Sequence, residues 1–379
     1  MIYLDHAAGT PMVPAALAAM LPLCRENAAN PSSTHAAGQA AARVLVAARE
    51  QLAALLECAP REVIFTSGGT EADNQALLTL AKNGEETGRK HLVVSAIEHP
   101  AVLRMAEWLQ TQGFAVTYVR PGPDGVLCAQ AFKEALRADT AGVSVMLANN
   151  EVGTLQPVAE IAALCRAHGV LCHTDAVQAA GQFPVSFGAL GVDMLSLSAH
   201  KFGGAKGAGA LLVRQDIQPA VLLRGGRQER GARAGTENLP AVAAMAAALA
   251  ASVEKQSETV PYVTALREQL IAGLERIHDA RLSGHRSRRV PGIVHFCFAG
   301  AESEMLLLLL DAQGICASAG SACEAGALES SHVLRAMGMP EAWARGAVRF
   351  SIGTENTPEQ IETTVRAAAY AAARLRGEV

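Results

Sequence analysis

The sequence predicts an α/β protein: a mainly parallel seven-stranded sheet with helices on both faces, plus a smaller α+β domain at the C-terminal end. Three observations support this prediction. The chain of 379 residues is 50% hydrophobic, so it can bury a sizeable core. Apolar strand-like runs alternate with helical stretches from about residue 63 to residue 213. Beyond Arg214 this alternation fades, which indicates a change of architecture.

The N-terminal region contains one predicted strand and two predicted helices. Residues 2–4 form a short apolar run that ends in turn-forming residues up to Pro11. A helix is expected at 14–24. Residues 30–35 are rich in turn formers, and a long alanine-rich helix is expected to follow from about 36 to 56.

Seven strands are predicted in the region of alternation. Each is a short, mostly apolar run, and most are separated by helical stretches. The strands are expected at 63–66, 92–95, 116–119, 143–148, 170–173, 192–197 and 210–213. Polar residues that follow parallel strands gather at one edge of the sheet, where α/β proteins bind ligands.

The C-terminal region has a different pattern. A helical region at about 239–277 leads to a strand at 290–298 and a helix at 302–310. A strand at 347–352 and a last helix at 357–375 follow. We therefore predict a large domain of residues 12–255 and a small domain formed by residues 1–11 and 256–379.

Charge and apolar patterning exclude several classes of partner. The 32 Lys and Arg residues nearly balance 36 Asp and Glu residues, with no long basic run, so nucleic acid is not expected and a small anionic ligand fits better. The longest apolar runs, 241–251 and 305–310, are shorter than the roughly 18–20 residues of a membrane span. No secretory signal pattern begins the sequence, so we expect a cytoplasmic chain. The eight cysteines show no CxxC pair, and neither a metal site nor a disulfide framework is expected.

The segment 194–201 carries the first candidate for chemistry. An apolar run ends in Ser198, His200 and Lys201, which brings a hydroxyl, an imidazole and an amine to one edge of the sheet. Lys201 could be a Schiff-base nucleophile. A surface lysine at a strand end is the alternative, and the choice depends on whether other residues also fit a pyridoxal phosphate site.

A phosphate site is suggested by residues 67–71, which follow a strand and open a helix. Glycines such as Gly69 allow close approach, the helix N-terminus attracts an anion, and Thr70 adds a hydroxyl group. Ser198 and His200 would add donors to the same phosphate. A helix N-cap without any ligand would use the same residues, so both interpretations stay open here.

Four residues are candidates for the ring of the cofactor and for the substrate. Asp175, at a strand end, could keep the pyridine nitrogen protonated, and Gln178 could donate to the ring oxygen. His99 could stack on the ring and move protons. Asn150 could bind the ring oxygen or a substrate carboxylate. A helix N-cap, a structural histidine and a turn are the respective alternatives for Asp175, His99 and Asn150.

Several motifs together resemble one family. In order, they occur at 3–5, 30–35, 67–74, 98–99, 149–153, 173–178, 198–201, 226–238, 318–323 and 349–351. They recur in the order seen in cysteine desulfurases and run nearly from end to end. The chain therefore resembles the NifS/IscS-like group of the class-V aminotransferase family, within the fold-type I pyridoxal phosphate (PLP) enzymes.

The resemblance implies roles for individual residues. It implies that Lys201 forms the Schiff base and that Arg349, with Asn150, grips the carboxylate of L-cysteine. Thr236 matches a residue that in the family reaches the phosphate of the other subunit, which implies a homodimer with shared sites. The positions that match the family's contacts to pyridoxal 5'-phosphate are Gly69, Thr70, His99, Asn150, Asp175, Gln178, Ser198, His200 and Lys201.

Cys323 distinguishes this chemistry from other PLP reactions. Small, turn-prone residues flank it, which suits a loop that brings a thiol to the substrate. The resemblance implies that its thiolate attacks the substrate sulfur, giving L-alanine and a persulfide on Cys323. A protein sulfur acceptor, such as an iron–sulfur scaffold, would then take up the sulfur.

Some features leave alternatives to this hypothesis. Gly9, Arg227 and Thr354 depart from the usual family pattern, although none is a proposed catalytic group. Selenocysteine lyase or cystine C–S lyase activity would use the same cofactor residues. Another PLP reaction, such as aminotransfer, would leave Cys323 without a role. A sulfur-carrier or scaffold-binding protein without catalysis is the non-enzyme alternative.

Overall fold

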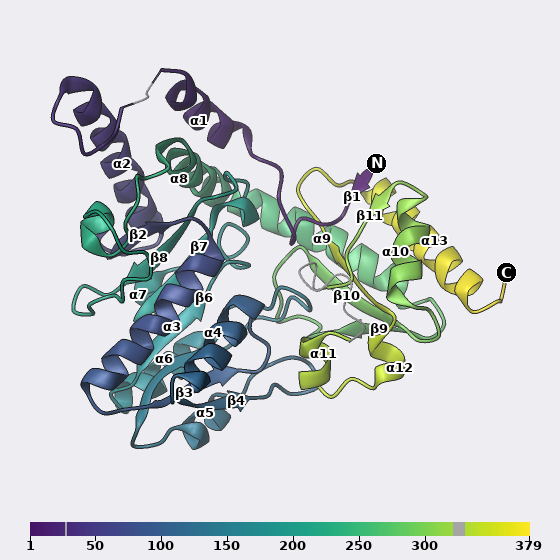
Figure 1. Ribbon diagram of the computed structural model, residues 1–379. Helices are drawn as coiled ribbons and strands as arrows, with labels where there is room; N and C mark the ends of the chain where they lie inside the picture. Colours follow the sequence, from purple (N-terminus) through teal and green to yellow (C-terminus); the bar gives the residue numbers. More distant parts are fainter. Residues whose placement is uncertain (27–28, 321–329) are drawn as a thin grey trace.

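The predicted seven-stranded sheet forms the centre of the larger part of the molecule (Figure 1). A computed structural model describes residues 1–26, 29–320 and 330–379. The strands are β2 (Val63–Thr66), β3 (His91–Ser95), β4 (Ala115–Val119), β5 (Thr140–Ser144), β6 (Leu171–Asp175), β7 (Met194–Ser198) and β8 (Gly209–Val213). Their order is β2-β8-β7-β6-β5-β3-β4. β8 runs antiparallel to β2 and β7, whereas the other pairings are parallel. The prediction of a mainly parallel sheet is confirmed.

One strand ends earlier than the sequence indicated. The apolar run predicted as a strand at 143–148 contributes only its first two residues to β5. The chain beyond Ser144 still follows β6, since the Val145 amide donates to the His173 carbonyl (3.0 Å). At Asn149 the side-chain oxygen accepts from the amides of Glu151 and Val152, and the resulting turn ends the extended run.

Helices cover both faces of the sheet, as predicted. On one face, α3 and α4 bury Leu77, Leu80 and Leu109 against the sheet. On the other face lies a separate core that includes residues from α2, α6 and α8. The helices of this part are α1 (Pro14–Glu26), α2 (Ala36–Leu55), α3 (Gly69–Glu86), α4 (Pro100–Thr111), α5 (Ala129–Ala135), α6 (Val158–Ala167), α7 (Phe187–Leu190) and α8 (Leu239–Glu254).

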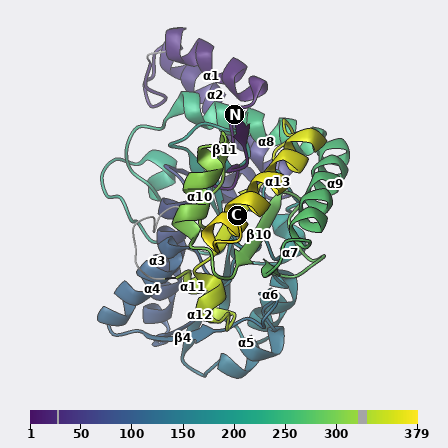
Figure 2. The same ribbon diagram turned by 90° about the vertical axis from the view of Figure 1, so that its right-hand side faces the viewer.

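The smaller part has its own sheet and helices (Figure 2). Its antiparallel strands β9 (Ala280–Ser283), β10 (Ile293–Phe298) and β12 (Ala347–Ser351) have the order β12-β10-β9. β1 (Ile2–Tyr3) pairs in parallel with β11 (Ile315–Cys316), so the N-terminus lies against this part. The sequence analysis did not predict β9 or β11. The helices are α9 (Gln256–Leu274), α10 (Ser303–Asp311), α11 (His332–Ala336), α12 (Glu341–Ala344) and α13 (Pro358–Leu375).

The hydrophobic cores bear on the predicted domains. Leu4 is buried in a cluster with Phe296, Phe350 and other residues between 263 and 372. This separate core supports the division into residues 12–255 and residues 1–11 with 256–379, which stays a prediction. The opposite face of β10 does not follow that division, because Cys297 joins the core of the larger part. None of the described helices is long and apolar enough to cross a membrane.

Candidate active site

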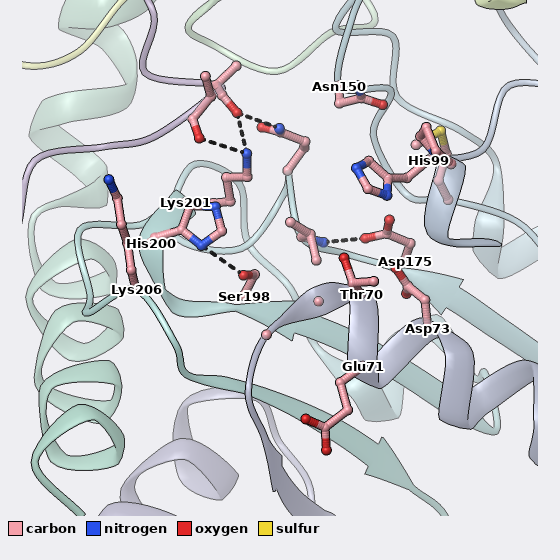
Figure 3. A pocket seen from close by; sticks show the side chains of 18 of the residues that line it. Thr70, Glu71, Asp73, His99, Asn150, Asp175, Ser198, His200, Lys201 and Lys206 are labelled. Carbon is pink, nitrogen blue, oxygen red and sulfur yellow. Dashed lines mark hydrogen bonds between the residues drawn. The ribbon is translucent and has the colours of Figure 1, made fainter. Parts of the chain in front are cut away.

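A cavity of about 490 Å³ opens where the carboxyl ends of β6 and β7 meet the N-terminus of α3. All but two of the predicted site residues line it, and Figure 3 shows the side chains of several of them, such as Thr70, Asp175 and Lys201, around one space. Thr236 is exposed and does not line this cavity, and Cys323 lies outside the described residues. The residues brought together are Gly69, Thr70, His99, Asn150, Asp175, Gln178, Ser198, His200, Lys201 and Arg349.

Glycines allow the backbone segments around the cavity to lie close together. A Cβ atom at Gly69 would lie 2.8 Å from the Val177 side chain, and one at Gly209 would lie 2.6 Å from the backbone of Gly68. The turn that opens α3 therefore packs directly on β8 and on the segment after β6. This packing places the first amides of α3 beside Ser198, the last residue of β7.

The amine of Lys201 is held by the N-terminal segment. Its Nζ atom donates to the carbonyl oxygens of Ala7 (2.6 Å) and Ala8 (3.1 Å). The Ala7 amide in turn donates to the Ser351 hydroxyl (2.9 Å), on β12. The segment thus connects the smaller sheet to the lysine. The sequence analysis missed both carbonyls, because backbone acceptors leave no residue-specific signal.

The end of the cavity near α3 suits a phosphate. Ser198 and His200 lie within hydrogen-bonding distance of each other (Oγ to Nδ1, 3.0 Å). Burial, with Lys201 and Lys206 nearby, lowers the pKa of His200 to about 4, so the ring is neutral at pH 7. Glu71, in the first turn of α3, pairs with Arg233 (2.9 Å), which offsets its charge next to an anion.

The carboxyl group of Asp175 lies at the other end. Its Oδ1 atom accepts from the Val177 amide (2.8 Å), which fixes the side chain. Burial raises the pKa of Asp175 to about 6, although the Val177 amide and Lys201 act in the opposite direction. Gln178 donates from Nε2 to the Ala7 carbonyl (3.0 Å), and its buried Oε1 atom has no hydrogen-bond partner among the described residues.

His99 is the N-cap of α4, so the structural interpretation raised for it also holds. Its Nδ1 atom accepts from the Ala101 amide (3.1 Å), which puts the proton of a neutral ring on Nε2. Burial, with Lys201 and His332 nearby, lowers the pKa of His99 to about 4. His99 also lines the cavity (Figure 3), so capping does not prevent contact with a ligand.

Arg349 closes the cavity from the smaller sheet. Its Nη1 atom donates to the carbonyl oxygens of Asn150 and Gly320, each at 2.8 Å, and Nη2 lies 3.1 Å from Asp5 Oδ1. Within the described chain, the buried Nε atom of Arg349 and the Oδ1 atom of Asn150 have no hydrogen-bond partner. Both residues line the cavity.

The sequence analysis assigned no role to several buried polar residues beneath the cavity. Asp73 and Glu98 are buried carboxyl groups, and His173 is a buried imidazole. Burial raises the pKa of Glu98 to about 8, although Ser95 and the Met146 amide (2.6 Å) donate to the carboxyl group. Two signals were available: His173 lies two residues before Asp175 on the same strand, and the motifs at 67–74, 98–99 and 173–178 contain all three residues.

The structure also bears on the three departures from the family pattern and on the expected absence of a metal site. Of the residues that depart from the family pattern, Arg227 and Thr354 are exposed, and the Gly9 carbonyl accepts from the Tyr3 hydroxyl (2.7 Å). None of the three lines the cavity. Across the described ranges, no group of three or more His, Cys, Asp or Glu side chains is arranged to hold a metal ion.

Comparisons with known proteins match almost the whole chain. The family profile described as aminotransferase class-V matches residues 2–364. The chain is 44% identical over 383 aligned positions to an IscS-like cysteine desulfurase of Mycobacterium tuberculosis, covering 99% of this chain and 97% of that protein. A solved NifS-like protein superposes with a TM-score of 0.92 at 35% identity, covering 97% of this chain and 98% of the other. SspA, solved in complex with cysteine, superposes with a TM-score of 0.82 at 33% identity, covering 94% and 100%.

Proposed function

Because the chain belongs to the aminotransferase class-V family, we propose that it is a cysteine desulfurase, which converts L-cysteine to L-alanine and passes the sulfur to an acceptor. The family match confirms the resemblance inferred from the motifs. The names of the relatives support the activity. The observation that carries the proposal is the convergence of Lys201, Asp175, His99 and Arg349 on one cavity.

The cavity fits pyridoxal 5'-phosphate. The N-terminus of α3 with Thr70, Ser198 and His200 would hold the phosphate, and Asp175 would face the ring nitrogen. Buried polar atoms that lack partners within the described chain, such as Gln178 Oε1, face a cost unless a ligand pairs with them. When bound, the cofactor supplies an electron-accepting ring that stabilises negative charge at the α carbon of an amino acid.

The chain's own residues would bind L-cysteine and move its protons. Arg349 and Asn150, which line the cavity, would hold the carboxylate. The amine of Lys201, the proposed Schiff-base residue, would remove the α-proton. When that amine is protonated, the Ala7 and Ala8 carbonyls can accept its hydrogen bonds. His99, neutral and protonated at Nε2, would act as a proton donor.

Sulfur transfer would use Cys323, which lies outside the described residues. Gly320, three residues before it, lines the cavity. The Cys323 thiolate would attack the substrate sulfur, so that one S–S bond forms while the C–S bond breaks. The carbon skeleton would take up the protons needed to leave as L-alanine, and the substrate sulfur would remain as the persulfide of Cys323.

The expected partners follow from the same proposal. Thr236 is exposed outside its own cavity, which supports a homodimer in which it reaches the partner's phosphate site. A protein sulfur acceptor, such as an iron–sulfur scaffold, would receive the persulfide sulfur in the cytoplasm. Selenocysteine lyase or cystine C–S lyase activity is the alternative on the same residues. Release of selenide or pyruvate, instead of alanine with sulfide, would identify it.

Mass spectrometry can test the proposal. The protein loaded with pyridoxal 5'-phosphate is mixed with L-cysteine and no reductant, and the peptide that holds Cys323 is expected to gain one sulfur atom. Cys323→Ala should abolish this gain, whereas the control Cys128→Ala, at an exposed cysteine outside the proposed site, should retain it. Lys201→Ala should lower alanine formation about a thousandfold, because it removes the acid–base group. Normal turnover by Lys201→Ala, or no sulfur on Cys323, would refute the proposal.

A further inference from the structure

A chain of buried hydrogen bonds runs beneath the cavity across three neighbouring strands. His173, on β6, lies 2.9 Å through Nδ1 from the Ser144 hydroxyl on β5 and 2.9 Å through Nε2 from the Ser196 hydroxyl on β7. All three side chains are fully buried. Asp73, on α3, is only 1% exposed, and its Oδ1 atom lies 3.7 Å from His173 Nε2. We call Asp73, His173 and Ser196 the buried layer.

Each member of the buried layer lies next to a proposed cofactor-binding group. Alternate residues of a strand point to the same face, so His173 shares a face with Asp175, and Ser196 shares one with Ser198. On α3, Asp73 follows the phosphate-binding turn by one helical turn. The layer therefore underlies both the phosphate end and the ring-nitrogen end of the cavity. Asp73 also lines the cavity, as Figure 3 shows.

The fold does not require polar groups at these positions. Apolar side chains fill most of the sheet's buried surface, and burying polar groups costs free energy unless they are paired. Hydrogen bonds between His173 and the Ser144 and Ser196 hydroxyls, however, hold these three side chains in one arrangement, whereas Asp73 Oδ1 has no hydrogen-bond partner among the described residues. The hydrogen bonds across β5, β6 and β7 thus fix the side chains directly beneath Asp175 and Ser198.

The charges around the buried layer are unequal. Burial and the nearby Asp175 raise the pKa of Asp73 well above its ordinary value, although Ser196 lowers it and Glu98 adds to the rise. Burial lowers the pKa of His173 to about 3. His173 is therefore neutral at pH 7, as is most of Glu98, whose pKa burial raises to about 8, and the surroundings of Asp73 favour its protonated form. Lys201 favours the ionised form of Asp175, which leaves the negative charge there.

We propose that Asp73, His173 and Ser196 are positioning residues that act through Asp175 and Ser198. Through the hydrogen bonds of His173 and the contact of Asp73 with it, this buried layer holds the two groups at the spacing that the ring nitrogen and the phosphate require. The inference rests on the proposed function, since pyridoxal 5'-phosphate is the ligand for which the spacing matters.

A matched pair of histidine substitutions tests the proposal. His91, the first residue of β3, is also fully buried and lies between two hydroxyl groups on neighbouring strands, Thr140 (2.8 Å) and Thr117 (2.9 Å), but it does not line the cavity. His173→Phe and His91→Phe therefore remove equivalent buried contacts, but only the first lies beneath the cavity. The readouts are the dissociation constant for pyridoxal 5'-phosphate and the pH midpoint of the bound cofactor's absorbance change.

The expected outcomes are distinct. His173→Phe should weaken cofactor binding at least about tenfold and shift the absorbance midpoint. Both variants should lower the unfolding temperature by similar amounts, because each loses two buried hydrogen bonds. His91→Phe, however, should leave both cofactor readouts unchanged. Equal cofactor readouts for the two variants would overturn the proposal. If the wild-type chain took up no pyridoxal 5'-phosphate, the proposed function would fail first and this inference with it.

Two smaller changes keep the test decisive if His173→Phe does not fold. Ser196→Ala removes one hydroxyl of the layer and should weaken cofactor binding several-fold. Burial and Asp175 favour the protonated form of Asp73, and Asp73→Asn supplies a neutral amide of the same shape, so the absorbance midpoint should stay at its wild-type value. A wild-type dissociation constant in Ser196→Ala, or a shifted midpoint in Asp73→Asn, would each contradict the proposal.

Discussion

Arg349 is largely fixed in place by the fold. Two carbonyl oxygens accept from Nη1, and Asp5 pairs with Nη2. Much of the side chain's conformational entropy is therefore lost on folding and need not be lost again when a substrate binds. The same contacts hold the side chain of Arg349 where it lines the cavity. At the scale of single residues, this preorganisation is what the proposed carboxylate contact depends on.

Replacing Arg349 should mainly affect substrate binding. Charge-assisted hydrogen bonds contribute roughly 1.5–3 kcal/mol, so Arg349→Ala should raise the KM for L-cysteine about 10- to 100-fold. Steady-state alanine production measures this, and Arg349→Lys should recover part of the loss. The control is Arg345→Ala, because Arg345 is an exposed arginine in the same region. An unchanged KM in Arg349→Ala would remove this residue from the proposed substrate site.

Strand β10 shows how one element serves two environments. Successive residues of β10 point to opposite faces of its sheet. Phe296 packs in the apolar core of the smaller part, whereas His295 lies on the face towards the larger part. His295 lies opposite Arg349 on β12 and is fully buried. Neither ring nitrogen of His295 has a hydrogen-bond partner among the residues that the structure describes. Burial, with Arg349 and Arg289 nearby, lowers the pKa of His295 to about 3.

This burial predicts a pH-dependent stability. The folded-state pKa of His295 lies below the ordinary value of 6.5, so its contribution is present above pH 6.5 and is lost as the pH falls towards 3. Between pH 7 and pH 5, His295→Gln should therefore lose about 2 kcal/mol less unfolding free energy than the wild type. Urea unfolding of the cofactor-free proteins at both pH values measures this difference.

The matched control is His278→Gln. The side chain of His278 is 81% exposed, so its replacement should leave the difference between pH 7 and pH 5 at the wild-type value. If His295→Gln lost as much free energy as the wild type on acidification, the imidazole would have to be protonated in the folded chain. That result would contradict its neutral burial on β10.

At the scale of the whole molecule, a second cavity of about 580 Å³ adjoins the active site. It shares Thr70 and His99 with the first cavity, and its mostly apolar wall includes Trp108 and Leu222. Trp108 is 47% exposed. Exposed apolar surface of this kind marks interaction sites. A second copy of the chain is the occupant we expect, because the proposed homodimer has to bury surface next to the active site.

The dimer hypothesis can be tested at this surface. The wild type should sediment at about twice the 39.4 kDa mass of one chain. Trp108→Asp should shift it towards the monomer and weaken retention of pyridoxal 5'-phosphate, because a buried charge disfavours association. Leu308→Asp, at a leucine that is 62% exposed on α10, is the control and should remain dimeric. A fully dimeric Trp108→Asp would place the interface elsewhere.

The sequence alone determined the α/β architecture and most of the candidate site. Parallel strands and helices alternate with distinct apolar patterns, and these patterns are local. Residues such as Asp175, Ser198 and Lys201 follow those strands, so their gathering at one edge was predictable once the strands were recognised. The family motifs added Arg349 and Thr236, whose roles no local pattern indicates.

Only the tertiary structure decided which neighbours those residues have. Lys201 donates to Ala7, 194 residues away, and Ser144, His173 and Ser196 meet across three strands. Side-chain contacts between strands depend on register and on which elements pack together, and neither is encoded by local spacing. Burial likewise made His173 neutral. Residue type and spacing thus predicted the available chemistry, whereas packing set the contacts and charge states that would direct it.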